Sequence, residues 1–280
     1  MPLSNVRTIL HPTDFSDAAL IAFVHALKLT IAFGAELELF HVEPDNTQTD
    51  WHWGPNVRAT LERWGVLSAG STDADLARLN IRVRRGTASG VAADKAIFEE
   101  LAASHADLVV MATHGRSGVQ RWLQPSVATP IVSKASVPVL IIPSNERGFV
   151  DPASGHSGLD RVLVPVDRSP SPKIAFEAAN ALLRSLGRDA AEIATLHVGP
   201  ELAEARQLFA EGREVQHLSI PSGDAVDVIL REATSWNADL VVMATEGRNG
   251  WLDGLRGSTV ERVLGRLATP LLVLPARKAA

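Results

Sequence analysis

The chain has 280 residues, no cysteine, and a formal net charge of -5 from 27 basic and 32 acidic residues. The length predicts about two domains of roughly 150 residues, and a hydrophobic content of 46% excludes a disordered chain. The absence of cysteine excludes disulfide frameworks and thiolate zinc sites, and the acidic balance argues against a nucleic-acid partner, since no basic excess is available to neutralise phosphates.

The first part of the chain alternates between strand-like and helix-like segments. Residues 8–11 form a short apolar and β-branched run, and Ser16 has the character of a helix N-cap. Gly34 suits the C-terminal cap of the same helix. Five apolar residues between these caps follow helical spacing and predict one buried face: Leu20, Phe23, Val24, Leu27 and Ile31. Further strands are predicted over 36–42, 81–85, 108–112 and 137–142, with a helix over 91–104.

The second part of the chain predicts the same order of elements. Its strands are expected over 161–166, 193–198, 215–220, 240–244 and 271–274, with helices starting at Pro172 and Ala225. Strands that alternate with helices imply parallel sheets joined by right-handed crossovers. We therefore predict an α/β fold of two tandem, doubly wound, five-stranded, Rossmann-like units.

The two parts are copies of one unit. Residues 106–118 (ADLVVMATHGRSG) and 238–250 (ADLVVMATEGRNG) are identical at eleven of thirteen positions, with an offset of 132. The offset is 153 between Asp14 and Asp167 and 156 between the LFHV and TLHV motifs, so the first copy holds about 24 extra residues, near 44–70. We expect domains over 1–145 and 160–280, with a linker over 146–159 that is rich in Gly, Ser and Pro.

Polar residues recur where the predicted strands end. Asp14 and Asp167 follow the first strand of each copy, His41 and His197 lie near the end of the second, and the glycine loops follow the fourth. In doubly wound folds a ligand binds beyond the carboxyl ends of the strands, where the strand order reverses. The sequence therefore predicts one crevice per copy.

The glycine-rich loop of the second copy carries the best chemical signal. Gly247 is separated by nine residues from Gly257, which Ser258 follows. The glycines let backbone amides approach a ligand, and Ser258-Thr259-Val260-Glu261 is a capping-box pattern that opens a helix. These features favour phosphate binding at the free N–H groups of a helix start. The alternative is that Gly257 only makes a turn and Ser258 only caps the helix.

The motifs together resemble those of a known family. They are ILHPTDFSDAA (9–19), LFHVEP (39–44), MATHGRSG (111–118), VPVLIIP (137–143), LVPVDRSP (163–170), LHVGP (196–200), MATEGRNG (243–250), RGSTVERVL (256–264) and TPLLVLP (269–275). The chain resembles a tandem universal stress protein, within the HUP-type adenine-nucleotide folds. The resemblance covers nearly the whole chain apart from the insertion and the linker. The family's ATP motif, G-x2-G-x9-G-[S/T], is matched in the second copy, with Ala244 in place of the first glycine.

The resemblance implies ATP as the ligand, with Mg²⁺ or Mn²⁺ bridging its phosphates, and the sequence shows no set of protein ligands for a metal. It implies that Asp167 contacts the adenosine part, that the backbone near Val198 meets the adenine, and that Pro165 and Ala244 line the ribose region. The full set of implied binding residues in the second copy is Pro165, Val166, Asp167, Val198, Ala244, Gly247, Arg248, Gly250, Gly257, Ser258 and Thr259. The family also implies that the fifth strands pair to form an internal pseudo-dimer, and that the chain forms a homodimer.

The first copy departs from the motif. Pro125 stands where the second copy has Gly257, and proline has no N–H to donate. Pro130 removes a further bond from the first turn of the following helix. We expect the first copy to bind ATP weakly or not at all. The residues that would hold a residual ligand there are Asp14, Val42, Gly115 and Ser126.

Three other groups of residues have alternative interpretations. His11, His41 and His114 could bind zinc with Asp14, although their spacing is not local. The tryptophans of the insertion, Trp51, Trp53 and Trp64, would cover the crevice, form a partner surface, or pin a long loop to its own domain. The arginines at 82, 84 and 85 are typical of a solvated strand edge, and those at 116, 248 and 256 flank the glycine loops.

No catalytic constellation is evident, so nucleotide binding is favoured over efficient catalysis. The leading hypothesis is an ATP-binding regulatory or protective protein of the stress response, with an unknown protein partner. The alternatives are a slow ATPase or nucleotide hydrolase, and a scaffold without nucleotide. The sequence shows neither a membrane-spanning run nor a signal-peptide pattern, and we expect a cytoplasmic protein without a membrane partner.

Overall fold

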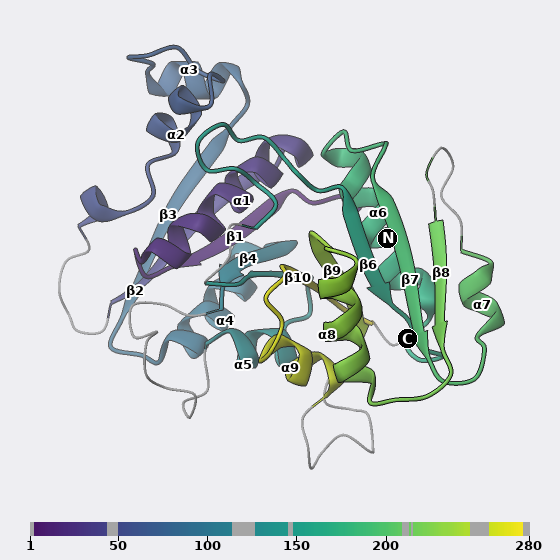
Figure 1. Ribbon diagram of the computed structural model, residues 1–280. Helices are drawn as coiled ribbons and strands as arrows, with labels where there is room; N and C mark the ends of the chain where they lie inside the picture. Colours follow the sequence, from purple (N-terminus) through teal and green to yellow (C-terminus); the bar gives the residue numbers. More distant parts are fainter. Residues whose placement is uncertain are drawn as a thin grey trace. The chain divides into compact units, whose positions relative to one another are not determined.

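The structure is a computed structural model of the chain (Figure 1). Two compact units make it up. The N-terminal unit comprises Val6–Ile131 and Ile141–Ser157, and the C-terminal unit comprises Gly158–Ala280 with Met1–Asn5 and Val132–Leu140. The described residues are 3–43, 50–113, 127–144, 148–208, 213, 215–246 and 258–276, without the side chains of Trp53 and Asp73.

The first copy of the repeat supplies five strands in the order β3-β2-β1-β4-β5. β1 runs parallel to β2 and β4, and β2 runs parallel to β3. The chain moves outward from β1 to β3 and then crosses back to β4, so right-handed crossovers place α1 and α4 on opposite faces. The strands are β1 (Thr8–Thr13), β2 (Glu36–Glu43), β3 (Arg82–Ser89), β4 (Leu108–Ala112) and β5 (Val139–Ile142).

The helices of this copy follow the predicted caps. Ser16 accepts a hydrogen bond from Ala19 N at the start of α1, and Gly34 ends the helix with φ 63°, a conformation that glycine adopts without a Cβ penalty. The helical elements are α1 (Asp17–Phe33), η1 (Trp51–Trp53), α2 (Val57–Arg63), α3 (Asp73–Arg78), α4 (Ala93–Ser104) and α5 (Ala128–Lys134).

The second copy repeats the arrangement in the order β10-β9-β6-β7-β8. Neighbouring strands pair in parallel throughout. Its elements are β6 (Arg161–Pro165), α6 (Pro172–Ser185), β7 (Glu192–Val198), α7 (Ala203–Arg206), β8 (Val215–Ile220), α8 (Ala225–Ser235), β9 (Leu240–Thr245), α9 (Thr259–Leu264) and β10 (Leu271–Pro275).

The predicted fold class is confirmed: the chain folds as two tandem Rossmann-like α/β units. β4 and β9 are buried along almost their whole length, as continuous apolar runs predict. The pairing of the two fifth strands and the domain boundaries at 145 and 160 stay predictions. One detail was wrong: Ile31, expected on the buried face of α1, is 36% exposed, because the helix buries its last turn less completely than its centre.

The predicted linker is packed against the N-terminal unit rather than solvated throughout. Val150 forms an isolated antiparallel bridge with Ser157. The buried ring of His25 on α1 lies under this segment, and its Nε2 accepts from Phe149 N at 3.0 Å and Val150 N at 3.1 Å. Trp64 of the insertion donates from Nε1 to Pro152 O at 3.1 Å. The composition of the segment indicated a loop but not these anchors.

Candidate functional site

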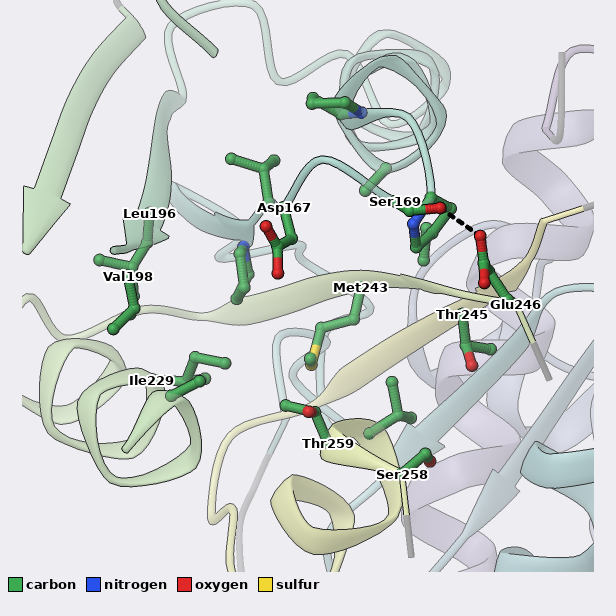
Figure 2. Close-up of a pocket in the computed structure, with 18 of the residues that line it drawn as sticks. Asp167, Ser169, Leu196, Val198, Ile229, Met243, Thr245, Glu246, Ser258 and Thr259 are labelled. Atoms are coloured by element: carbon green, nitrogen blue, oxygen red, sulfur yellow. Dashed lines mark hydrogen bonds between the residues drawn. The ribbon is translucent and has the colours of Figure 1, made fainter. Parts of the chain in front are cut away.

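A pocket of about 200 Å³ lies in the C-terminal unit, beyond the carboxyl ends of β6, β7 and β9 (Figure 2). This is the edge where a doubly wound sheet binds its ligand. The lining residues come from the ends of these strands and from α6, α8 and α9: Pro165, Val166, Asp167, Ser169, Pro170, Ser171, Pro172, Ala175, Leu196, Val198, Ala225, Ile229, Met243, Ala244, Thr245, Glu246, Ser258, Thr259 and Val260.

Asp167 lies where the chain leaves the sheet. β6 ends at Pro165, and Val166 still donates its N–H to Leu196 O at 2.9 Å. The Asp167 carboxylate accepts from Arg168 N at 2.7 Å, and its side chain is 72% exposed. An ionised carboxylate only accepts hydrogen bonds, so this position offers an acceptor to a ligand hydroxyl.

His197 holds the two loops that border this part of the pocket. Its Nδ1 lies 3.0 Å from Val166 O and its Nε2 lies 2.9 Å from Pro200 O. The ring is 5% exposed, and it lies between the Val166 and Pro200 carbonyl groups. The histidine thereby fixes the backbone on either side of Val198.

The floor and one wall of the pocket are apolar. Leu196 and Val198 come from β7, Ile229 from α8 and Met243 from β9. Three of these residues are buried, each with at most 6% of its surface exposed: Leu196, Ile229 and Met243. Figure 2 shows the side chains of Val198, Ile229 and Met243 on the side of the pocket that Asp167 also faces. The combination offers a flat apolar group a surface next to a polar acceptor.

The start of α9 borders the opposite side. Ser258 is its N-cap and accepts from Glu261 N at 3.2 Å, while Glu261 accepts from Ser258 N, which completes the capping box. Arg262 N donates to Ser258 O at 3.1 Å and begins the helical ladder. The side chains of Ser258 and Thr259 both line the pocket, so the predicted cap is also part of the pocket wall.

Ser169 and Glu246 connect two loops at the rim. Ser169 Oγ, in the β6–α6 loop, donates to Glu246 Oε1, which follows β9 (Figure 2). The sequence analysis assigned no binding role to Ser169, Glu246 or the apolar wall. Glu246 differs from the matched His114 inside an otherwise repeated motif, and that difference was the available signal. The residues of the apolar wall lie in ordinary amphipathic patterns, so the sequence contains no signal that would identify them.

Seven of the predicted binding residues are brought together in this pocket, namely Pro165, Val166, Asp167, Val198, Ala244, Ser258 and Thr259. Their predicted role toward a nucleotide stays a prediction. The others in this copy, Gly247, Arg248, Gly250 and Gly257, lie outside the described residues, as do Gly115, Ser126 and Pro125 of the first copy.

The matching edge of the N-terminal unit has a different arrangement. His41 keeps the bond that His197 makes, with Nδ1 at 2.7 Å from Thr13 O. Asp14, however, accepts from Ser16 N at 3.1 Å and Ser16 Oγ at 2.6 Å. The carboxylate that follows the first strand is therefore engaged by the cap of α1. Val42 lies next to His41 at the end of β2.

An aromatic stack occupies this edge. The Phe15 ring lies parallel to His41, with centroids 4.2 Å apart, and Trp51 of the insertion packs edge-on against Phe15 at 5.3 Å. Phe15 has φ 61°, which a bulky residue adopts only when its surroundings hold it there. A Cβ on Gly54 would lie 2.9 Å from the Phe15 ring and 3.0 Å from the Trp51 ring. The insertion is thus closely fitted to the end of β1.

The helix that follows β4 also starts differently. α5 begins at Ala128, whereas α9 begins at Thr259, the match of Val127. Pro130 matches Arg262, whose N–H makes the first helical bond in the C-terminal unit. Because proline cannot make that bond, the first intrahelical bond here comes from Ile131 N to Val127 O, at 3.4 Å.

Two of the three histidines considered as zinc ligands, His11 and His41, contact backbone carbonyl groups. His11 is fully buried, and its Nδ1 lies 2.8 Å from Val110 O. Burial lowers the pKa of His11 to about 4, against the smaller opposing effects of Val110 O and Asp14. Within the described ranges, no three His, Cys, Asp or Glu residues group so as to hold a metal ion; His114 lies outside them. Among the described helices, none is both long and apolar enough to cross a membrane.

Comparison with known proteins identifies the sequences and structures that this chain resembles. The model of the universal stress protein family matches residues 5–143 and 188–275. The universal stress protein MJ0531 of Methanocaldococcus jannaschii is 28% identical over 49% of this chain and 81% of its own. Mb2028c of Mycobacterium bovis, also described as a universal stress protein, is 27% identical over 61% of this chain and 62% of its own. The crystal structure of a universal stress protein from Archaeoglobus fulgidus aligns over 96% of both chains, with TM-score 0.62 and 22% identity.

Proposed function

Because the chain belongs to the universal stress protein family, we propose that its C-terminal unit binds an adenine nucleotide, chiefly ATP, and that the protein acts as a nucleotide-dependent regulatory or protective protein of the stress response. One observation supports this most directly. A pocket at the carboxyl ends of β6, β7 and β9 combines an apolar wall with the exposed Asp167 carboxylate and with the hydroxyl groups of Ser258 and Thr259. Ligand pockets generally pair an apolar lining with a few polar groups that fix orientation.

The apolar wall suits the base. Val198, Ile229 and Met243 offer a surface for one face of the adenine ring, and Asp167 offers an acceptor to the ribose hydroxyls. The pocket is smaller than the ~300–1,000 Å³ typical of sites that enclose a drug-sized ligand. We therefore expect it to hold the base and ribose, with the phosphates at its mouth.

Among the described residues, the hydroxyl groups of Ser258 and Thr259 would then donate hydrogen bonds to the phosphates. From the sequence we expect Gly247, Arg248, Gly250 and Gly257 to complete the phosphate site. If Mg²⁺ or Mn²⁺ accompanies the nucleotide, phosphate oxygens and water would supply most of its ligands, because no three potential ligands group together in the described part of the chain. Such an ion would neutralise phosphate charge near Glu246.

Regulation requires that ATP prefer one state of the protein over another. The Ser169–Glu246 bond joins the two loops at the rim of the pocket, and phosphates beside Glu246 would repel its carboxylate. A nucleotide would thereby favour a different arrangement of these loops, which offers a partner protein a changed surface.

Isothermal titration calorimetry with ATP tests the proposal, with the two aspartates as a matched pair. We expect one nucleotide per chain. Asp167→Asn should weaken binding about tenfold, because a charge-assisted hydrogen bond contributes about 1.5–3 kcal/mol. Asp14→Asn should leave the affinity unchanged. Absence of binding to the unaltered protein, or an equal loss in both variants, would contradict the proposal.

A further inference from the structure

A second cavity, of about 600 Å³, lies in the N-terminal unit and is lined by residues of the edge strand β3 and of the segment between β2 and β3. β3 is the last strand in its order, so one edge has no strand partner. Residues that point to both faces of β3 line the cavity, which therefore runs along that free edge. The lining residues are Asn56, Val57, Arg58, Leu76, Ala77, Asn80, Ile81, Arg82, Val83 and Arg85.

Three arginines converge on this cavity, and no acidic side chain among the described residues lines it. Their neighbour Arg84 shows the contrast, since it pairs with Glu36 and Glu38 on β2. Arg82 and Arg85 take part in no ion pair within the described part of the chain. Arg82 and Arg85 therefore lie beside the cavity without a carboxylate partner among the described residues, although the protein has a net charge of -5.

The third arginine and the aromatic neighbour are held in place. Arg58 donates from a terminal nitrogen to Ser71 O at 3.3 Å, near Glu62, whose carboxylate accepts from Ser71. The Arg85 guanidinium lies 5.5 Å from the centroid of the Trp51 ring. A cation over an aromatic face keeps its edge N–H groups available for an anion.

The described part of the C-terminal unit lacks this arrangement. Its β8 carries Gln216 and His217 where β3 carries Arg84 and Arg85, as the pairing of both strands with their neighbours shows. It also lacks the insertion that supplies Arg58. The basic cavity is therefore not a requirement of the repeated fold.

We propose that this cavity binds a small, multiply charged oxyanion, either an oligophosphate or a polycarboxylate. Its volume falls within the range of small-molecule sites, and arginine recognises both groups through paired N–H donors. Charged residues on an edge strand also prevent strands from pairing with it. That role would need neither a cavity nor Arg58 from a second element. The site does not rest on the proposed nucleotide pocket.

The test is calorimetry of the full-length protein with inorganic tripolyphosphate and, separately, with citrate. We expect Arg82→Gln/Arg85→Gln to weaken binding by about tenfold for each arginine removed. The matched control is Arg78→Gln/Lys95→Gln, which removes the same charge from exposed residues outside the cavity and should bind normally. Loss with both probes assigns a general oxyanion site, and loss with tripolyphosphate alone assigns an oligophosphate site.

Hydrogen exchange of the unaltered protein gives a readout that does not depend on a variant that folds. Tripolyphosphate or citrate should slow exchange at the amides of 56–58 and 82–85. If neither anion binds, if the arginine variant binds as well as the control, or if protection appears only in the C-terminal unit, the proposal is overturned.

Discussion

The two ligand-side edges of this protein start from the same motif and end in different arrangements. Each edge keeps a histidine that contacts the carbonyl before the aspartate, His41 to Thr13 and His197 to Val166. In the C-terminal unit this contact borders a pocket that Asp167 lines. In the N-terminal unit Phe15 stacks on the ring of His41, and Trp51 packs edge-on against Phe15.

The comparison shows where the copies diverged physically. The strongly repeated fourth strand keeps the same buried role in both units. The divergence lies in the residue after the aspartate, Phe15 against Arg168, and in the insertion that supplies Trp51. The repeated sheet edge therefore carries different side chains beside the histidine in the two units.

Acidification should produce the largest difference in stability between the two units. Burial lowers the pKa of His11 and of His25 to about 4 in the N-terminal unit. A histidine whose folded pKa lies below its unfolded value stabilises the fold fully above pH ~6.5, and this stability is lost as pH falls toward 4. The loss is on the order of 3 kcal/mol for each histidine. In the C-terminal unit burial also lowers the pKa of His217, but that residue is exposed.

Hydrogen exchange between pH 7 and 4.5 measures this, with the amides of α1 and α6 as matched reporters. We expect α1 to lose protection first. His11→Val, which installs the residue found at the matched position 164, should reduce the acid effect by about half and change neutral stability by less than about 1 kcal/mol. Equal loss of protection in the two helices would show that the buried histidines do not set the difference.

The aromatic stack should contribute the next largest effect. Trp51→Ala should destabilise the N-terminal unit by about 3 kcal/mol, the lower end for a large aromatic because Trp51 is half-buried. Amides near 13–17 and 40–42 should exchange faster, whereas Trp236→Ala in the C-terminal unit should leave them unchanged. We expect ATP stoichiometry to stay at one per chain, because Pro125 is still present. A stoichiometry of two would show that the stack, rather than the proline, separates the crevices.

Much of this arrangement could be predicted from the sequence, because short-range patterns determine it. The strand and helix periods, the caps at Ser16 and Ser258, and the repeat itself located nearly every strand. The residues after each strand then indicated the pocket edge, since parallel strands bring their carboxyl ends together.

The parts that were not predicted depend on contacts between distant segments. The two α-helices between β2 and β3, α2 and α3, are short, and their amphipathic pattern is too brief to detect. The Phe15–Trp51 stack joins residues 36 positions apart in sequence, and nothing local to either residue signals it. The buried role of His25 similarly depends on the segment near 149–150.

Glu38 should make a smaller contribution to the pH dependence of the stability of the N-terminal unit, opposite in sign to that of the two histidines. Burial first, and then Glu100, raises the pKa of Glu38 to about 7, although Arg84 opposes the shift. A carboxyl whose folded pKa is raised stabilises the fold below its unfolded pKa of 4.5, and this stability is lost as pH rises toward 7. Its matched position in the C-terminal unit is Ala194.

Glu38→Gln should therefore stabilise the N-terminal unit at pH 8 relative to the unaltered protein and have little effect at pH 4.5. It should also steepen the loss of stability caused by the histidines on acidification. Denaturant unfolding at the two pH values measures this. A Glu38→Gln variant that is less stable at pH 8 would indicate that the ion pair with Arg84 outweighs the cost of burial.

The helix caps should give the smallest effect. Ser258→Ala removes the acceptor for Glu261 N at 3.2 Å and should cost about 1 kcal/mol of unfolding free energy. Ser258→Thr should keep most of that stability, because threonine also caps helices. In the first copy α5 begins at Ala128, so the cap position is Val127 and has no side-chain acceptor. Ser126→Ala should therefore change the unfolding free energy by less than about 0.5 kcal/mol. If the two serines cost the same amount, the helix starts would be equivalent, and the difference between the two edges would have to come from the aromatic stack and the aspartates alone.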